Sequence, residues 1–255
     1  MLYSGLPFSE RLAEAGQAGI SHIEFWDYRD KDLALLSRQL DKFCLQISNI
    51  SGNRLYGMVD PLEEQLFYDE ISKTIKVSAR LGCPRIMLLV QRLMTDGKAK
   101  PAPGHLTSEQ KINQIIACGR AAGELADKWN CGIVIEPLNS IEDHPDYFLD
   151  SSSLAFRIIR EIDHPRVKLL YDIYHMSVMG EDILSDLDHY LNLIGYIHAA
   201  DRPGRLEPGS GEIGYERIFS HLKRLDFEGT VGFECYPSGG DSVKAIRNIL
   251  NLISS

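Results

Sequence analysis

Short apolar runs and amphipathic helical patterns alternate along the whole chain. Runs rich in Val, Ile, Leu and aromatic residues predict strands, and apolar residues at helical spacing between them predict helices. Strands are predicted at residues 20–26, 45–50, 85–90, 132–136, 167–172, 194–198 and 231–234, with an eighth candidate at residues 1–4. Helices are predicted at residues 8–19, 33–43, 62–81, 107–129, 152–162, 182–193, 215–225 and 242–252.

Repeated strand–helix units with nearly continuous apolar strands predict a parallel sheet that is covered on both faces. A closed (β/α)₈ barrel and an open doubly wound sheet both fit this repeat. Charged residues end at least four of the strands, and a closed ring can gather those ends at one centre. We therefore predict an α/β fold with a single TIM-barrel domain over residues 1–255. Its first strand is curtailed, or the barrel is slightly open there, because only a few residues precede the first helix.

Four of the predicted strands end on an acidic or imidazole side chain: Glu136, Asp172, His198 and Glu234. A buried apolar strand leads into a charge only where that end meets something polar. Three carboxylates and one imidazole are suitable ligands for a hard or borderline divalent cation. A single glutamate at a strand end is explained by exposure to solvent. Four acidic or imidazole residues at matching positions of different strands predict a metal site.

Further polar residues follow these strand ends. Asn139 lies just after Glu136 and can hydrogen-bond a carboxylate or a substrate hydroxyl, and His175 follows Asp172 by three residues. The Gly- and Pro-rich loop after His198 carries Arg202 and Arg205, which can hold a carboxylate or phosphate through two parallel hydrogen bonds.

Composition narrows the classes of function. The net charge of −9 disfavours a nucleic-acid partner, which needs clustered Lys and Arg. The five cysteines are scattered without CxxC spacing, so neither a structural zinc site nor a disulfide framework is predicted. Because there is neither a signal-peptide pattern nor a spanning apolar run, we expect a cytoplasmic protein without membrane contact. Residues 91–105, rich in Lys, Gly and Pro, are either a lid or a disordered surface excursion.

Several segments resemble the hydroxypyruvate isomerase family, within the xylose-isomerase-like TIM barrels of the sugar isomerase and epimerase superfamily. They are residues 7–12, 23–26, 135–139, 172–175, 197–213 and 233–236. The resemblance implies that Glu136, Asp172, His198 and Glu234 bind the metal and that Glu136 and Glu234 are also the catalytic acid/base pair. It implies that His175 and Arg205 contact the substrate, and Glu142 falls where epimerases present a further substrate-binding glutamate. Hydroxypyruvate isomerases often have Gln where this chain has His198, whereas ketose 3-epimerases have His.

The function implied is a metal-dependent isomerase of a small keto sugar or keto acid, with one Mn²⁺, Mg²⁺ or Co²⁺ ion and proton transfer through an enediolate. The alternatives are a ketose 3-epimerase or other sugar or sugar-phosphate isomerase, a zinc endonuclease of the same barrel type, and a non-catalytic barrel. The acidic net charge disfavours the nuclease, and the intact ligand set disfavours a non-catalytic role. The sequence is compatible with a homo-oligomer.

Overall fold

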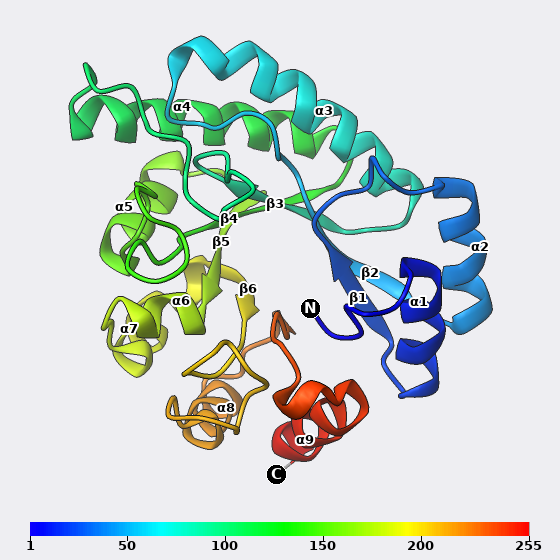
Figure 1. The fold of residues 1–255 in the computed structure, drawn as a ribbon. Coiled ribbons are helices and arrows are strands. Elements are labelled where there is room, and N and C mark those ends of the chain that lie inside the picture. The colour runs from blue at the N-terminus through cyan, green and yellow to red at the C-terminus, as the bar shows by residue number, and fades with distance from the viewer. Residues whose placement is uncertain (255) are drawn as a thin grey trace.

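The computed structural model describes residues 1–254, in which parallel strands form a ring surrounded by helices (Figure 1). The described strands follow one another in chain order around the sheet, and every neighbouring pair is parallel. They are β1 (His22–Phe25), β2 (Gln46–Ser51), β3 (Arg85–Leu89), β4 (Gly132–Glu136), β5 (Val167–Asp172), β6 (Ile194–His198) and β7 (Thr230–Gly232). This arrangement confirms the predicted TIM-barrel architecture.

The helices confirm the predicted alternation with two differences. They are α1 (Phe8–Gln17), α2 (Leu33–Phe43), α3 (Glu64–Arg80), α4 (Ser108–Asp127), α5 (Ser152–Ile162), α6 (Ile173–Val178), α7 (Ile183–Tyr190), α8 (Tyr215–Arg224) and α9 (Ser242–Ser254). The segment predicted as one helix at 182–193 ends in a short 3₁₀ turn, Leu191–Leu193. Helix α6 was not predicted as a separate element; it begins directly after β5 because the Asp172 carboxylate accepts a hydrogen bond from the backbone N–H of His175.

The barrel is open between β1 and β7, since the described residues contain no pairing between these two strands. The candidate eighth strand at residues 1–4 is wrong, because these residues form a turn. Pro7 occupies the N-cap position of α1, so residues 1–6 would have to supply both an ordinary strand of ~5–6 residues and its connection to the helix. The turn is held instead by Tyr3, whose backbone N–H donates to Ser242 Oγ of α9 at 2.8 Å. In Figure 1 the N-terminus lies beside this opening.

The register of the strands brings their carboxyl ends to one face of the ring. Asp172 pairs with His198 between β5 and β6, and His198 pairs with Gly232 between β6 and β7. Glu136 pairs with Leu89 at the end of β3. Strand β7 is shorter than predicted, so Glu234 lies two residues beyond its last residue. Backbone pairing therefore aligns Asp172 directly with His198, and the chain beyond β7 carries Glu234 to the same end of the ring.

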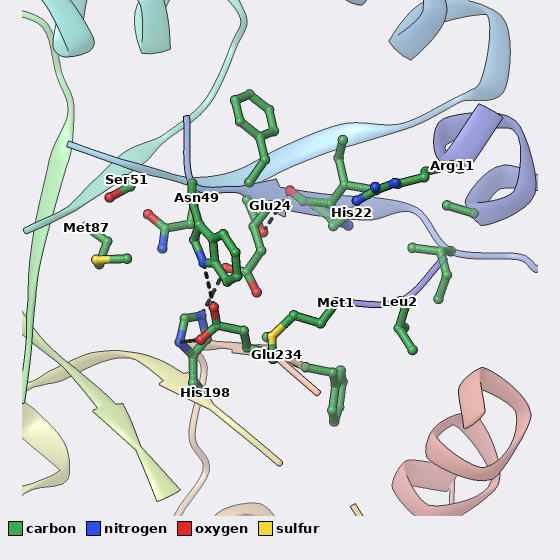
Figure 2. A pocket seen from close by; sticks show the side chains of 18 of the residues that line it. Met1, Leu2, Arg11, His22, Glu24, Asn49, Ser51, Met87, His198 and Glu234 are labelled. Carbon is green, nitrogen blue, oxygen red and sulfur yellow. Dashed lines mark hydrogen bonds and ion pairs between the residues drawn. The ribbon is translucent and has the colours of Figure 1, made fainter. Parts of the chain in front are cut away.

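A cavity of about 440 Å³ occupies the side of the barrel where β1 and β7 do not meet (Figure 2). Apolar side chains such as Leu2, Phe25 and Met87 line part of it. At its inner end it reaches His198 and Glu234. The opening in the barrel and the polar strand ends therefore share one space.

The loop over residues 91–105 packs against the segment that follows β4. The backbone N–H of Ala99 donates to Pro145 O at 3.0 Å, and His144 Nδ1 lies 2.8 Å from Gly97 O. Gln91 Nε2 donates to Lys100 O and Asp146 O, which closes the base of the loop. These bonds give the loop a defined path beside residues 143–148. Among the described helices, none is both long and apolar enough to cross a membrane.

Candidate metal centre and active site

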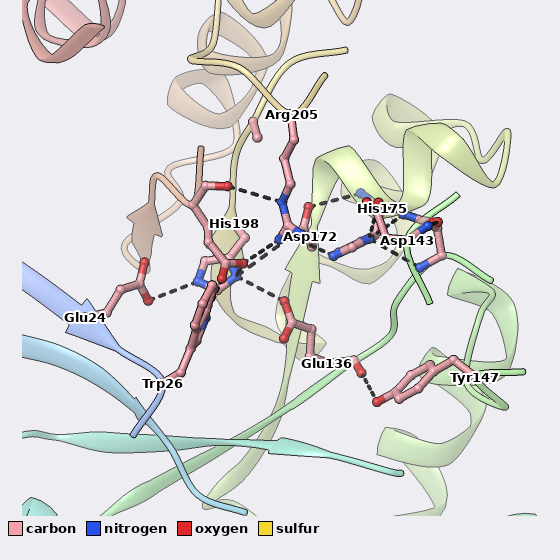
Figure 3. A network of polar contacts seen from close by, with 12 residues as sticks. Glu24, Trp26, Glu136, Asp143, Tyr147, Asp172, His175, His198 and Arg205 are labelled. Atoms are coloured by element: carbon pink, nitrogen blue, oxygen red, sulfur yellow. Dashed lines mark hydrogen bonds and ion pairs between the residues drawn. The ribbon is translucent and has the colours of Figure 1, made fainter. Parts of the chain in front are cut away.

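The four predicted ligands converge on one point. One ligand atom from each of Glu136, Asp172, His198 and Glu234 lies within 4.8 Å of the others. His198 Nδ1 is 3.0 Å from Glu136 Oε1, 3.6 Å from Glu234 Oε2 and 3.8 Å from Asp172 Oδ2. Figure 3 shows Glu136, Asp172 and His198 pointing toward one another from their separate strands.

The donor set fits one divalent ion. Oxygen and nitrogen ligands bind such ions at roughly 2.0–2.3 Å, so two ligands on opposite sides of an ion are about 4–4.6 Å apart. The spread of the four ligand atoms, up to 4.8 Å, agrees with this separation. Glu136, Asp172 and His198 are buried at the ends of their strands. Their surroundings therefore hold these three donor groups in place.

Burial and mutual repulsion make the ionised carboxylates of this cluster unfavourable unless positive charge lies nearby. Burial raises the pKa of Glu136 to about 7, and the neighbouring carboxylates of Glu234 and Asp172 push it the same way against the favourable effect of His198. Burial also raises the pKa of Asp172. The pKa of Glu234 is lowered despite burial, because Arg205 and His198 lie close to it.

Glu24 and Trp26 of the N-terminal region complete the cluster, although the sequence analysis did not identify them. Glu24 Oε2 lies 3.0 Å from His198 Nε2, on the side of the imidazole that faces away from the other carboxylates. Trp26 Nε1 donates to Glu234 Oε1 at 2.6 Å. The sequence offers one indication of Glu24: it is a charged residue between Ile23 and Phe25 in the predicted strand 20–26.

Both ring nitrogens of His198 lie 3.0 Å from a carboxylate oxygen, Nε2 from Glu24 and Nδ1 from Glu136. A divalent ion held by the four ligands would take the place of the proton on Nδ1, while Glu24 accepts the hydrogen bond of Nε2–H. Tyr196 OH also donates to Glu24 Oε2 at 3.2 Å, which holds the carboxylate in place. Glu24 is therefore suited to orient a metal-binding imidazole.

Arg205 reaches the cluster from the loop after β6. Its Nη2 lies 2.6 Å from Glu234 Oε2 and 3.7 Å from Asp172 Oδ2, and its guanidinium stands over the Tyr174 ring at 5.3 Å. The loop is organised by the buried Asp201, whose carboxylate accepts four backbone N–H groups, those of Arg202, Gly209, Gly211 and Ile213. Arg202 turns away and donates to Ser177 O.

Of the other residues predicted to contact the substrate, His175 and Asn139 are buried beside the cluster and Glu142 is not. His175 is fully buried with its Nε2 3.7 Å from Asp172 Oδ2, so it lies beside the cluster. Asn139 is also fully buried and bonds to His175. Glu142 is exposed and is not brought into the cluster; the acid that bonds to Asn139 is its neighbour, Asp143, at 2.6 Å.

The contact between Glu24 and His198 generates a prediction about metal affinity. Glu24→Gln keeps the size of the side chain but replaces an anionic acceptor with an amide, so we expect divalent-ion affinity to fall by about 10–100-fold. Isothermal titration of the apo-protein with Mn²⁺ measures this loss. Glu216→Gln, on the exposed face of α8, is the matched control and should bind Mn²⁺ like the unmodified chain. Equal affinity for the Glu24 variant would contradict the assignment.

Comparison with known proteins agrees with this fold. The sequence profile of the xylose isomerase-like TIM barrel family matches residues 10–253. Hydroxypyruvate isomerase of Escherichia coli K12 is 30% identical over 93% of this chain and 91% of its own. An AP endonuclease, family 2, from Brucella melitensis superposes with a TM-score of 0.88 at 22% identity, covering 98% of this chain and 95% of its own. A structure of the IOLI protein with a bound zinc atom superposes with a TM-score of 0.76 at 17% identity, over 98% and 94% of the two chains.

The two superpositions are below 25% identity and show a shared fold. The curated relative is an isomerase, which confirms the prediction of an isomerase enzyme. The match over nearly the full length establishes that the chain belongs to the xylose isomerase-like TIM barrel family.

Proposed function

We propose that the protein is a metal-dependent isomerase that moves a proton between neighbouring carbons of a small keto acid or keto sugar, with hydroxypyruvate as its substrate. The observation that carries the proposal is the convergence of Glu136, Asp172, His198 and Glu234 within 4.8 Å. The name of the Escherichia coli relative supports the choice of hydroxypyruvate.

The four strand-end residues would hold the ion. A bound Mn²⁺, Mg²⁺ or Co²⁺ would polarise the carbonyl and stabilise the enediolate that forms when a neighbouring C–H loses its proton. Glu136 and Glu234 come from β4 and from the segment after β7, so they approach the centre from different sides of the ring. One carboxylate takes the proton from carbon and the other returns a proton to the adjacent carbon, as general base and general acid.

Arg205 and His175 would hold the substrate beside these groups. A planar guanidinium matches a carboxylate through two parallel hydrogen bonds, and hydroxypyruvate carries such a carboxylate. The Arg205 side chain is only 13% exposed and already pairs with a carboxylate, so a substrate anion would exchange one carboxylate partner for another. This chemistry favours an acidic substrate over a neutral one.

A ketose 3-epimerase is the second candidate, and the observation that favours it is the imidazole at position 198. His198 stands among the converging ligands, where epimerases of the superfamily carry histidine. Both candidates remove a proton from a carbon next to a carbonyl, but an isomerase returns a proton to the neighbouring carbon, whereas an epimerase returns it to the same carbon from the opposite face. A cytoplasmic location is part of the proposal, and the cysteines of the described chain are all free thiols, as a reducing compartment would keep them.

The proposed proton-transfer pair predicts a loss of turnover. Glu136→Gln and Glu234→Gln preserve side-chain size but remove the carboxylate, so each should lower kcat by about 10²–10⁴-fold. Steady-state assays with hydroxypyruvate measure the rate, and elemental analysis of the same samples measures bound metal, because both residues are also ligands. Variants that keep metal and full turnover would show that these carboxylates do not transfer the proton.

The proposed role of Arg205 predicts discrimination between substrates. Arg205→Lys keeps the positive charge but loses the two-pronged geometry, so kcat/KM for hydroxypyruvate should fall by at least ~10-fold. A neutral ketose offers only hydroxyls and should lose less. The ratio of the two kcat/KM values, measured for both proteins, gives the result. Turnover of the ketose with none of hydroxypyruvate would replace the first candidate with the epimerase.

A further inference from the structure

Asn139 uses its whole side chain on partners within the protein. Its Oδ1 accepts hydrogen bonds from the backbone N–H groups of Glu142 and Asp143, each at 2.9 Å. Its Nδ2 donates to Asp143 Oδ2 at 2.6 Å and lies 2.7 Å from His175 Nδ1. Because two backbone donors and one carboxylate acceptor are involved, only one orientation of the amide satisfies all of these bonds.

The fixed amide determines which nitrogen of His175 carries the proton. Nδ1 faces the Nδ2–H of Asn139 and also the Asn139 backbone N–H at 3.3 Å, so it faces two donors. A ring nitrogen that accepts hydrogen bonds has no proton of its own, and in a neutral imidazole the proton is then on Nε2.

The Nε2–H of His175 has a defined direction and no acceptor. Within residues 1–254, this buried atom has no hydrogen-bond partner. Asp172 uses Oδ1 to accept from the His175 backbone N–H, which leaves Oδ2 for the metal centre. His175 Nε2 and Arg205 Nη2 each lie 3.7 Å from that Oδ2. The free donor and the guanidinium therefore lie beside the same oxygen of the converging ligand Asp172.

We propose that Asn139 is a positioning residue that fixes His175 as the Nε2–H tautomer, so that the imidazole donates a hydrogen bond to a substrate oxygen at the metal centre. A buried donor without a partner is costly, and a substrate oxygen at that place would remove the cost on binding. The structure thus gives Asn139 a role behind His175 in place of the direct substrate contact predicted from the sequence. That the acceptor is a substrate oxygen rests on the proposed function. The tautomer of His175 rests only on its contacts with Asn139.

The tautomer is tested by ¹⁵N NMR of the histidine-labelled, Mg²⁺-loaded protein, with His175→Gln used to assign the signals of the ring. We expect a protonated Nε2 and an unprotonated Nδ1. In Asn139→Asp a carboxylate replaces the donor, so the proton should move to Nδ1. The double substitution Asn139→Asp with Asp143→Asn removes the like-charge pair and should show the same move. Asn113→Asp, an exposed position on α4, makes the same chemical change away from the site and should leave the His175 signals unaltered.

Kinetics test the consequence for the substrate. With hydroxypyruvate, Asn139→Asp should raise KM by roughly 10–100-fold while bound metal stays at the level of the unmodified protein, since one donor is lost and the ligands are not. A proton on Nδ1 of His175 in the unmodified protein, or a ring protonated on both nitrogens, would overturn the proposal. An unchanged KM in a variant whose tautomer has moved would overturn it as well. If no substrate is turned over but Nε2 carries the proton as expected, the proposed function fails while the role of Asn139 in setting the tautomer stands.

Discussion

The mutual repulsion of buried carboxylates is the constraint on which the centre of this molecule depends. Glu136, Asp172 and Glu234 come from the ends of β4 and β5 and from the segment after β7, and their oxygens lie within 4.8 Å of one another. Charges that are removed from water at this range raise the free energy of the ionised state unless positive charge lies among them. Arg205 supplies part of that charge from the protein, and the geometry of the donors fits a divalent ion for the remainder.

The two histidines of the site have different roles because their ring nitrogens are oriented in opposite ways. His198 turns Nδ1 toward the acidic ligands and Nε2 toward Glu24. His175 turns Nδ1 toward Asn139 and leaves Nε2 facing the centre. One ring is therefore arranged to give a lone pair to a cation and the other to give a proton donor to a substrate. In both cases the residue behind the ring, a carboxylate or an amide, determines the arrangement.

The sequence predicted the strand–helix alternation and the converging ligands for a simple physical reason. Parallel strands end on the same edge, so the residues that terminate apolar runs, such as Asp172 and His198, must meet in space. Glu24 was missed because it lies inside an apolar run, where nothing local distinguishes it from a solvent-facing strand residue. The role of Asn139 depends on His175, which lies 36 residues away and is brought near by the fold. The choice between Glu142 and its neighbour Asp143 depends on loop geometry, which the sequence pattern does not determine.

The most direct test of the central claim is the anomalous difference density of a crystal of this protein soaked with Mn²⁺ and measured near the manganese absorption edge. The account predicts a strong peak among Glu136, Asp172, His198 and Glu234, at ligand distances of roughly 2.0–2.3 Å from their oxygen and nitrogen atoms. The same data should show His198 bound through Nδ1 with Nε2 still against Glu24. A peak elsewhere in the barrel, or none at this centre at saturating Mn²⁺, would contradict the account.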